Sequence, residues 1–171
     1  MYTNTVTSTN TDSIEVLAVN PDGIPDLLKM RPQFVGWRAD IKPDGKLDKI
    51  PLIANTTRPA STADLMAWDW FEKAYEGYEN GTHDGIGFVF CSADPFVGLD
   101  FDNCRNPETG EVDSDVLEYI ECYENRYVEV SPSGTGVHLI TLGKIRGGFK
   151  KGVREVYDRG RFFTLTGVRC A

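Results

Sequence analysis

The second half of the chain contains six short runs rich in β-branched and aromatic residues, each followed by a turn-forming segment. Runs of this length between Gly, Pro, Asn and Asp are typical of strands and are too short for most helices. With two helical patterns interspersed, they predict an α+β domain built on an antiparallel or mixed sheet. The runs are residues 85–90, 96–101, 127–130, 137–142, 153–157 and 162–166.

Strand partners can be predicted where two runs are close in sequence. Gly85–Phe90 and Phe96–Phe101 are separated by a short segment with turn chemistry, and we expect them to pair as antiparallel neighbours. Phe34–Arg38 and Lys49–Leu52 flank a Pro43-Asp44-Gly45 turn and predict a β-hairpin that carries two cations.

Three segments show helical spacing. Apolar residues recur from Asp64, a helix-start residue, to Asn80-Gly81, which predicts one helix over this range. Its aromatic stripe could be a base-stacking platform, but core packing is the favoured interpretation. A second amphipathic helix is expected around residues 116–123, and a short one over residues 23–30.

Length and composition fit one domain. The 171 residues, 40% of them hydrophobic, can bury one substantial core, and we expect a single domain over residues 12–171 with lobes of roughly 12–84 and 85–171. Residues 1–11 are mostly Thr, Asn and Ser and predict a disordered leader. No apolar run is long enough for a membrane helix and no secretion signal is evident, so a cytoplasmic protein without a membrane partner is expected.

Cysteine and histidine usage argues against zinc. The four cysteines form no CxxC pair, and two histidines cannot build a multi-histidine centre. The net charge of −8 argues against binding nucleic acid through bulk electrostatics. The charge is uneven, however, because residues 64–129 are acidic and residues 144–169 are largely basic. Such a division suits an enzyme that holds cations in one place and phosphates in another.

The most informative segment is Val97-Gly98-Leu99-Asp100-Phe101-Asp102. On a strand, Asp100 and Asp102 would project from one face while Leu99 and Phe101 enter the core. Adjacent carboxylates attract hard divalent ions, and two such ions can stabilise both the attacking and the leaving oxygen in phosphoryl transfer. The alternative is a solvated strand end that happens to be acidic.

A second segment, Ser131–His138, has the composition of a tight turn leading into a strand. Ser133, Gly134 and their neighbours could expose several backbone N–H groups, a geometry that can cradle the phosphate oxygens of a triphosphate. His138 would leave the turn on the next strand. A plain hairpin turn followed by a strand histidine is the alternative.

The third segment, Arg154–Gly167, offers another carboxylate and several guanidinium groups that could bind phosphate. Strand alternation does not decide between Glu155 and Asp158 as the third acid. Asp158 precedes Arg159-Gly160 and could simply begin a turn.

Together, Gly98–Asp102, Ser133–His138 and Glu155–Gly167 resemble, in order and spacing, the motifs of the primase-polymerase domain of the archaeo-eukaryotic primase superfamily. This domain occurs in replication proteins of phages, plasmids and related mobile elements. The resemblance extends from about residue 34 to residue 167, and it implies an RRM-like catalytic sheet with an N-terminal α/β lobe.

The resemblance also implies roles for individual residues. Asp100, Asp102 and Glu155 would hold two catalytic Mg²⁺ or Mn²⁺ ions, which favours Glu155 over Asp158. The turn residues Ser133 and Gly134, with His138 and Arg161, would contact the triphosphate, and His138 would also be catalytic. Lys49 is a weaker nucleotide-contact candidate, because a solvated strand lysine is about as plausible.

The activity implied is a template-directed nucleotidyltransferase, a DNA primase and polymerase acting on single-stranded template, primer and nucleoside triphosphates. A C-terminal helicase or accessory domain would be a natural partner. A flexible basic loop with Lys150 and Lys151 is a candidate template contact, with an ordinary solvated loop nearly as plausible. The rival interpretations are a two-metal nuclease and a non-catalytic DNA-binding initiator module.

Overall fold

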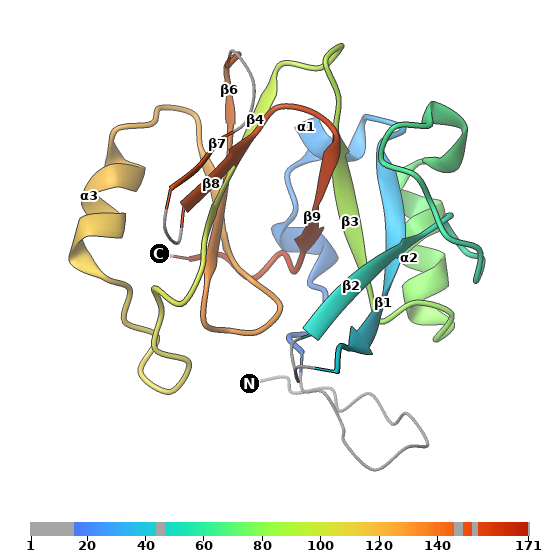
Figure 1. Cartoon of the computed structure of the whole chain (residues 1–171), viewed down its shortest axis with the longest axis horizontal. Coiled ribbons are helices and arrows are strands. Elements are labelled where there is room, and N and C mark those ends of the chain that lie inside the picture. The colour runs from blue at the N-terminus through green and yellow to red at the C-terminus, as the bar shows by residue number, and fades with distance from the viewer. Residues whose placement is uncertain (1–15, 44–46, 146–148, 152–153, 171) are drawn as a thin grey trace.

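The computed structural model describes residues 16–43, 47–145, 149–151 and 154–170. The predicted disordered leader at residues 1–11 lies outside the described residues. The described chain is an α+β domain with two antiparallel sheets and a few helices, in agreement with the predicted class. The two sheets lie next to each other, with the helices toward the sides and rear of the view (Figure 1).

The first sheet, sheet A, has the strand order β2-β1-β3-β9. The predicted hairpin is confirmed, because Gly36 to Ile41 of β1 pair antiparallel with Leu52 to Leu47 of β2. On its other side β1 pairs with β3, and β3 in turn pairs with β9, which is distant in sequence. The bounds are β1 Phe34–Ile41, β2 Leu47–Leu52, β3 Gly85–Phe90 and β9 Arg161–Leu165.

The predicted pairing of residues 85–90 with 96–101 is wrong, because these runs belong to different sheets. The cause is a rigid corner centred on the buried carboxylate of Asp94. It accepts hydrogen bonds from the backbone N–H groups of Cys91 (2.9 Å) and Phe96 (2.7 Å) and from the Gln33 side chain (2.7 Å). The corner therefore leads the chain from one sheet into the other.

The second sheet, sheet B, has the strand order β5-β6-β4-β8-β7. One strand, β7, was not predicted, since its basic and glycine-rich surroundings indicated a loop. The bounds are β4 Phe96–Phe101, β5 Tyr127–Val130, β6 Val137–Leu142, β7 Phe149–Lys151 and β8 Arg154–Tyr157.

The helix expected from residue 64 to residue 80 begins later than predicted. The Asp64 side chain caps only a short 3-10 turn by accepting a hydrogen bond from Met66 N–H. Asp69 then pairs with Phe34 through two backbone hydrogen bonds of 2.8 and 2.9 Å, which draws the chain against β1 before the helix can start. The helical elements are η1 Pro21–Gly23, α1 Asp26–Lys29, η2 Leu65–Ala67, α2 Phe71–Glu79 and α3 Ser114–Glu121.

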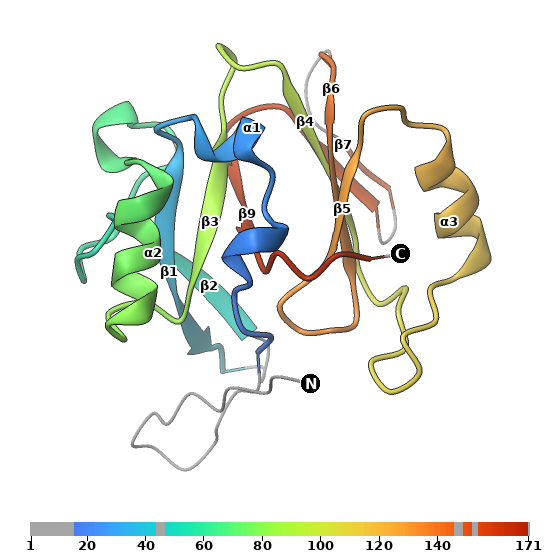
Figure 2. The ribbon, with the colours of Figure 1, turned by 180° about the vertical axis from the view of Figure 1, so that it is seen from behind.

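The helices cover different sheets. The predicted amphipathic helix around residues 116–123 is confirmed as α3, which packs on sheet B, whereas α2 packs on β1 and β3 of sheet A (Figure 2). Within the described residues, every helix is too short or too polar to cross a bilayer.

Two apolar clusters lie on opposite faces of sheet B. One lies between α3 and sheet B and includes Leu99 and Phe101. The other joins sheet A, sheet B, α1 and α2, and includes Phe90 and Phe163. Gly98 of β4 lets the sheets approach, since a Cβ there would lie 2.5 Å from the Phe90 ring and 2.6 Å from the Phe163 ring. The two sheets are thus held together at the face of β4 opposite α3.

Candidate active site

Sheet B carries a cross-strand row of ionisable residues. Asp100 on β4 lies directly opposite His138 on β6 and opposite Glu155 on β8. The row continues to Glu129 on β5, which lies opposite His138. At its other end, Lys150 on β7 is the register partner of Glu155. Directly opposed residues of antiparallel strands share a face of the sheet. Segments far apart in sequence therefore place their polar residues in one line.

Alternation along β4 separates this row from the core. Leu99 and Phe101 are buried in the cluster beneath α3, so Asp100 projects from the opposite face with 25% of its side chain exposed. It borders a pocket of about 240 Å³ to which both sheets contribute. The pocket is lined by Leu47, Asp48, Lys49, Asp100, His138, Phe162, Phe163 and Thr164.

His138 lies between two carboxylates. Its Nε2 is 3.6 Å from Oδ1 of Asp100, and its Nδ1 is 3.2 Å from Oε1 of Glu129. The imidazole is almost fully buried and packs against the Phe163 ring, with 5.0 Å between ring centroids. The ring is therefore constrained on three sides, and its Nε2 edge is directed toward Asp100.

Glu129 was not predicted as a site residue, although its side chain is fully buried in the row. Its second oxygen, Oε2, accepts hydrogen bonds from the Tyr127 hydroxyl (2.6 Å) and from the backbone N–H groups of Thr166 (3.0 Å) and Gly167 (2.8 Å). Burial, together with the nearby Glu129 carboxylate, raises the pKa of the Tyr127 phenol. One acid in the otherwise apolar run Tyr127–Val130 was the signal in the sequence that could have identified it.

Lys49 of β2 reaches the same pocket from sheet A. Its Nζ donates a hydrogen bond of 3.4 Å to Oγ1 of Thr164. Burial lowers the pKa of the Lys49 ammonium, while the nearby carboxylates of Asp100, Asp102 and Glu129 oppose that shift. A partly buried cation thus lies close to three acids that come from two different strands and a turn.

The predicted shared face requires Asp102 to lie on the strand with Asp100, but Asp102 lies outside it. It follows the last residue of β4, and the next residue, Asn103, has a φ of 51°, so the chain turns there. Strand alternation therefore does not determine the direction of the Asp102 side chain. Its effect on the pKa of Lys49 nevertheless puts its carboxylate near the same ammonium as that of Asp100.

Glu155 occupies the register position beside Asp100, and its carboxylate accepts a hydrogen bond from the Tyr157 hydroxyl. The Arg161 guanidinium lies 5.2 Å from the centroid of the Tyr157 ring, which places this arginine near the Glu155 end of the row. Asp158, the alternative third acid, is committed elsewhere: it is buried and pairs with Arg159 through contacts of 2.7 and 2.9 Å.

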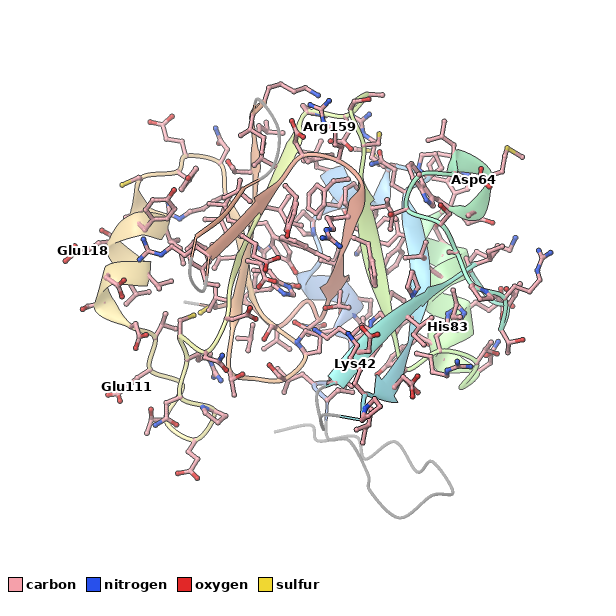
Figure 3. The ribbon with its side chains drawn as sticks, in the orientation of Figure 1. Lys42, Asp64, His83, Glu111, Glu118 and Arg159 are labelled. Carbon is pink, nitrogen blue, oxygen red and sulfur yellow. The ribbon has the colours of Figure 1, made fainter. Side chains whose placement is uncertain are left out.

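The hydrogen bonds from Arg159 hold the pKa of Asp158 below its usual value. Arg159 lies at the top of the molecule in Figure 3, whereas Lys42, which pairs with the pocket residue Asp48 at 3.3 Å, lies beside β2. In this view, Arg159 and its partner Asp158 therefore lie at the opposite end of the molecule from Lys42.

The acidic side chains of the site are of the chemical type that binds divalent cations. Their carboxylate oxygens are the ligand type that Mg²⁺ and Mn²⁺ prefer. Across the part of the chain that the structure describes, however, no three His, Cys, Asp or Glu side chains are gathered into a metal-binding cluster. The register places Asp100 and Glu155 side by side, so the donors fit such an ion in kind, and two of the predicted ligands are neighbours on adjacent strands.

The turn at residues 131–136 differs from the predicted phosphate cradle. The N–H of Gly134 donates to the Ser131 carbonyl (2.9 Å), that of Gly136 to Ser131 Oγ (3.1 Å), and that of Thr135 to Ser133 Oγ (3.4 Å). These donors are used within the turn because serine hydroxyls supply local acceptors. The described residues that line the pocket include neither Ser133 nor Gly134.

The predicted basic template contact is described only in part. Lys150 and Lys151 belong to β7, whose backbone pairs with β8. Lys144, at the start of the same segment, donates hydrogen bonds to the carbonyls of Ser92 (2.9 Å) and Asp94. Its ammonium therefore anchors the segment to the corner between β3 and β4.

A two-sheet α+β domain that sets carboxylates, a buried histidine and a partly buried lysine around one pocket defines a class of site suited to handling a cation and an anionic substrate. The chain is 32% identical over 142 residues to the DNA primase-polymerase of Nitratiruptor phage NrS-1. This similarity covers 79% of the chain and shows that it carries a primase-polymerase domain. The chain spans only 19% of the length of the phage protein, and no protein-family model matches it.

Proposed function

We propose that this domain is a template-directed nucleotidyltransferase that adds nucleotides from nucleoside triphosphates to a primer 3′-hydroxyl during replication of a phage or related mobile element, with sheet B as its RRM-like core. One observation carries the proposal: Asp100 and His138, the central members of the row, line the same pocket as Lys49, and Glu155 and Glu129 lie beside them in the register. The phage relative, named a DNA primase-polymerase, supports the reaction class.

The acidic side chains would hold the metal ions. Asp100 and Glu155 are neighbours in the register, and Asp102 follows β4 close enough to Lys49 to affect its pKa. Bound Mg²⁺ or Mn²⁺ would activate the attacking hydroxyl and neutralise charge on the departing pyrophosphate. Without a cation, the acids would repel a triphosphate, and Lys49 would supply a compensating charge.

The cations and the histidine would hold the triphosphate. Lys49 and Thr164 line the sheet A side of the pocket and are joined by a hydrogen bond, so they present donors to an anion at a fixed place. His138 lines the sheet B side, and Arg161 lies against Tyr157 beside Glu155. Donors fixed before binding favour one orientation of the substrate, which is how positioning accelerates transfer.

A primer-extension assay tests the proposal directly. The chain is incubated with a labelled primer on a single-stranded template, Mg²⁺ or Mn²⁺, and either ribo- or deoxyribonucleoside triphosphates. We expect the primer to lengthen with the parent chain and to stay unchanged with Asp100→Asn. Shortening of the primer, abolished by the same substitution, would instead identify a two-metal nuclease. The same assay on unprimed template tests initiation.

A further inference from the structure

Glu129 uses its two carboxylate oxygens for different partners. Oε2 accepts from the Tyr127 hydroxyl and from the backbone N–H groups of Thr166 and Gly167, at 2.6 to 3.0 Å. Oε1 lies 3.2 Å from Nδ1 of His138. The side chain is completely buried, so these partners determine which way the carboxylate is oriented.

The donors around Oε2 restrict what can occupy that position. A backbone N–H can only donate, and burying two of them without an acceptor is strongly unfavourable. The position of Oε2 must therefore hold an acceptor. Because an ionised carboxylate only accepts, its other oxygen Oε1 requires a proton on Nδ1 of the imidazole.

The same contacts link His138 to sheet A. Thr166 and Gly167 directly follow β9, and Thr166 Oγ1 also donates to the Val130 carbonyl at 2.7 Å. Glu129 thus connects β5 of sheet B with the strand of sheet A that carries Thr164. A change at Glu129 would alter the relation between His138 and the opposite wall of the pocket.

We propose that Glu129 is the positioning residue of this site: it keeps a proton on Nδ1 of His138 and holds the Nε2 edge of the ring toward Asp100 and the pocket. A hydrogen-bonded carboxylate that fixes the tautomer of a functional histidine has this effect in other sites. The placement of the proton depends only on the contacts, whereas its consequence for catalysis rests on the proposed function.

Glu129→Gln is a sharp test because the two side chains have the same shape. The three donors around the Oε2 position require the amide oxygen of the glutamine there, so its NH₂ group must face Nδ1 of His138. Nδ1 then has to accept, so the ring can no longer be protonated at both nitrogens and its remaining proton lies on Nε2. We expect the ¹⁵N chemical shifts of the labelled imidazole to report Nδ1 as protonated in the parent and unprotonated in the variant.

Two further variants keep the test decisive. The chain has two histidines, so His138→Gln assigns the signals by removing one set and leaving that of His83. Tyr127→Phe removes one donor to Oε2 but leaves both backbone donors, and Nδ1 should stay protonated. An unprotonated Nδ1 in the parent, or a protonated one in folded Glu129→Gln, overturns the proposal. If Glu129→Gln does not fold, the parent and Tyr127→Phe spectra decide it.

The catalytic consequence is measured separately. We expect Glu129→Gln to raise the KM for the nucleoside triphosphate, or lower kcat/KM, by about 10- to 100-fold, as is typical when a supporting hydrogen bond of a functional site is removed. Tyr127→Phe should remain within a few-fold of the parent. A parent chain without nucleotidyl transfer but with a protonated Nδ1 would refute the proposed function and leave the assignment of Glu129 standing, so the two failures are distinguishable.

Discussion

The two faces of sheet B are built from the same strands yet contain opposite chemistry. Beneath α3, the side chains of Leu99, Phe101 and Leu139 are buried in an apolar cluster. On the other face, the pocket is lined by Asp100, which lies between Leu99 and Phe101 in sequence, and by His138, which directly precedes Leu139. The positions beneath α3 therefore serve only the fold, whereas the opposite set combines core residues such as Phe96 and Ile140 with the polar groups of the row. Stability and activity should thus respond differently to substitution of Leu99 and Asp100, one position apart.

The largest effect is expected from the polar face. Asp100→Asn removes the central carboxylate of the row, and the loss of several kcal/mol of transition-state stabilisation corresponds to a rate about a thousandfold lower. The melting temperature should change little, because asparagine has the same size and shape as aspartate and fills the same space. Primer extension and thermal unfolding measure the two quantities.

Asp48→Asn is the matched control for that prediction. Asp48 also lines the pocket, but its carboxylate is 46% exposed and pairs with Lys42 at the surface. Its removal should change the extension rate by no more than a few-fold. Equal losses from the two substitutions would mean that the pocket needs negative charge in general rather than the row.

The apolar face should respond in the opposite way. Leu99 is 2% exposed, and Leu99→Ala should lower the free energy of unfolding by about 2–5 kcal/mol through reduced burial and a residual cavity. Urea unfolding measures this. Leu142→Ala, at an exposed position of β6, should cost less than about 0.5 kcal/mol. A large fall in extension rate per folded Leu99→Ala molecule would show that the two faces are not independent.

The sequence was sufficient for features that depend on local pattern. The hairpin of β1 and β2 was identified from its turn residues and alternation, and α3 from its apolar spacing. Asp100 was singled out as part of an acidic strand pair, and His138 because the turn before it resembles a motif of the primase-polymerase family. The structure then showed them to be direct cross-strand neighbours.

Features that depend on distant partners were not accessible. A turn between residues 90 and 96 does not specify which strand each side will join, and the hydrogen bonds of Asp94 decide it. Glu129 becomes conspicuous only when Thr166 and Gly167, far along the chain, are seen to donate to it. The N–H groups of the turn before His138 looked free because the acceptor role of Ser131 is a matter of three-dimensional geometry.

Smaller effects should distinguish Glu155 on β8 from Asp158 in the turn that follows this strand. Asp158→Asn weakens the paired contacts with the exposed Arg159 and should lower the free energy of unfolding slightly at neutral pH. Because the pKa of Asp158 is lowered in the folded chain, this stabilisation is present above the unfolded-state pKa and is lost as the pH falls through the folded-state pKa. The difference in urea unfolding between parent and variant should therefore shrink in acid.

Glu155→Gln provides the comparison. It sits beside Asp100 in the register, so its extension rate should fall while its unfolding free energy stays near that of the parent. Asp158→Asn should show the reverse: an altered stability and a nearly unchanged rate per folded molecule. If Asp158→Asn were the less active of the two, the register would be a poor guide to the third acid.

The smallest expected effect concerns the edge of sheet B, where Lys150 on β7 is the register partner of Glu155. Each lysine that binds a phosphate of single-stranded DNA contributes about 0.7 to the slope of log affinity against log salt concentration. The double substitution Lys150→Gln and Lys151→Gln should therefore reduce the slope by about that amount for every phosphate released, with affinity changed about tenfold or less.

Lys73→Gln, on α2 and paired with Asp69, should leave the slope unchanged. An identical slope in all three chains would place the template elsewhere and limit the functional part of the row to the four residues from Glu129 to Glu155.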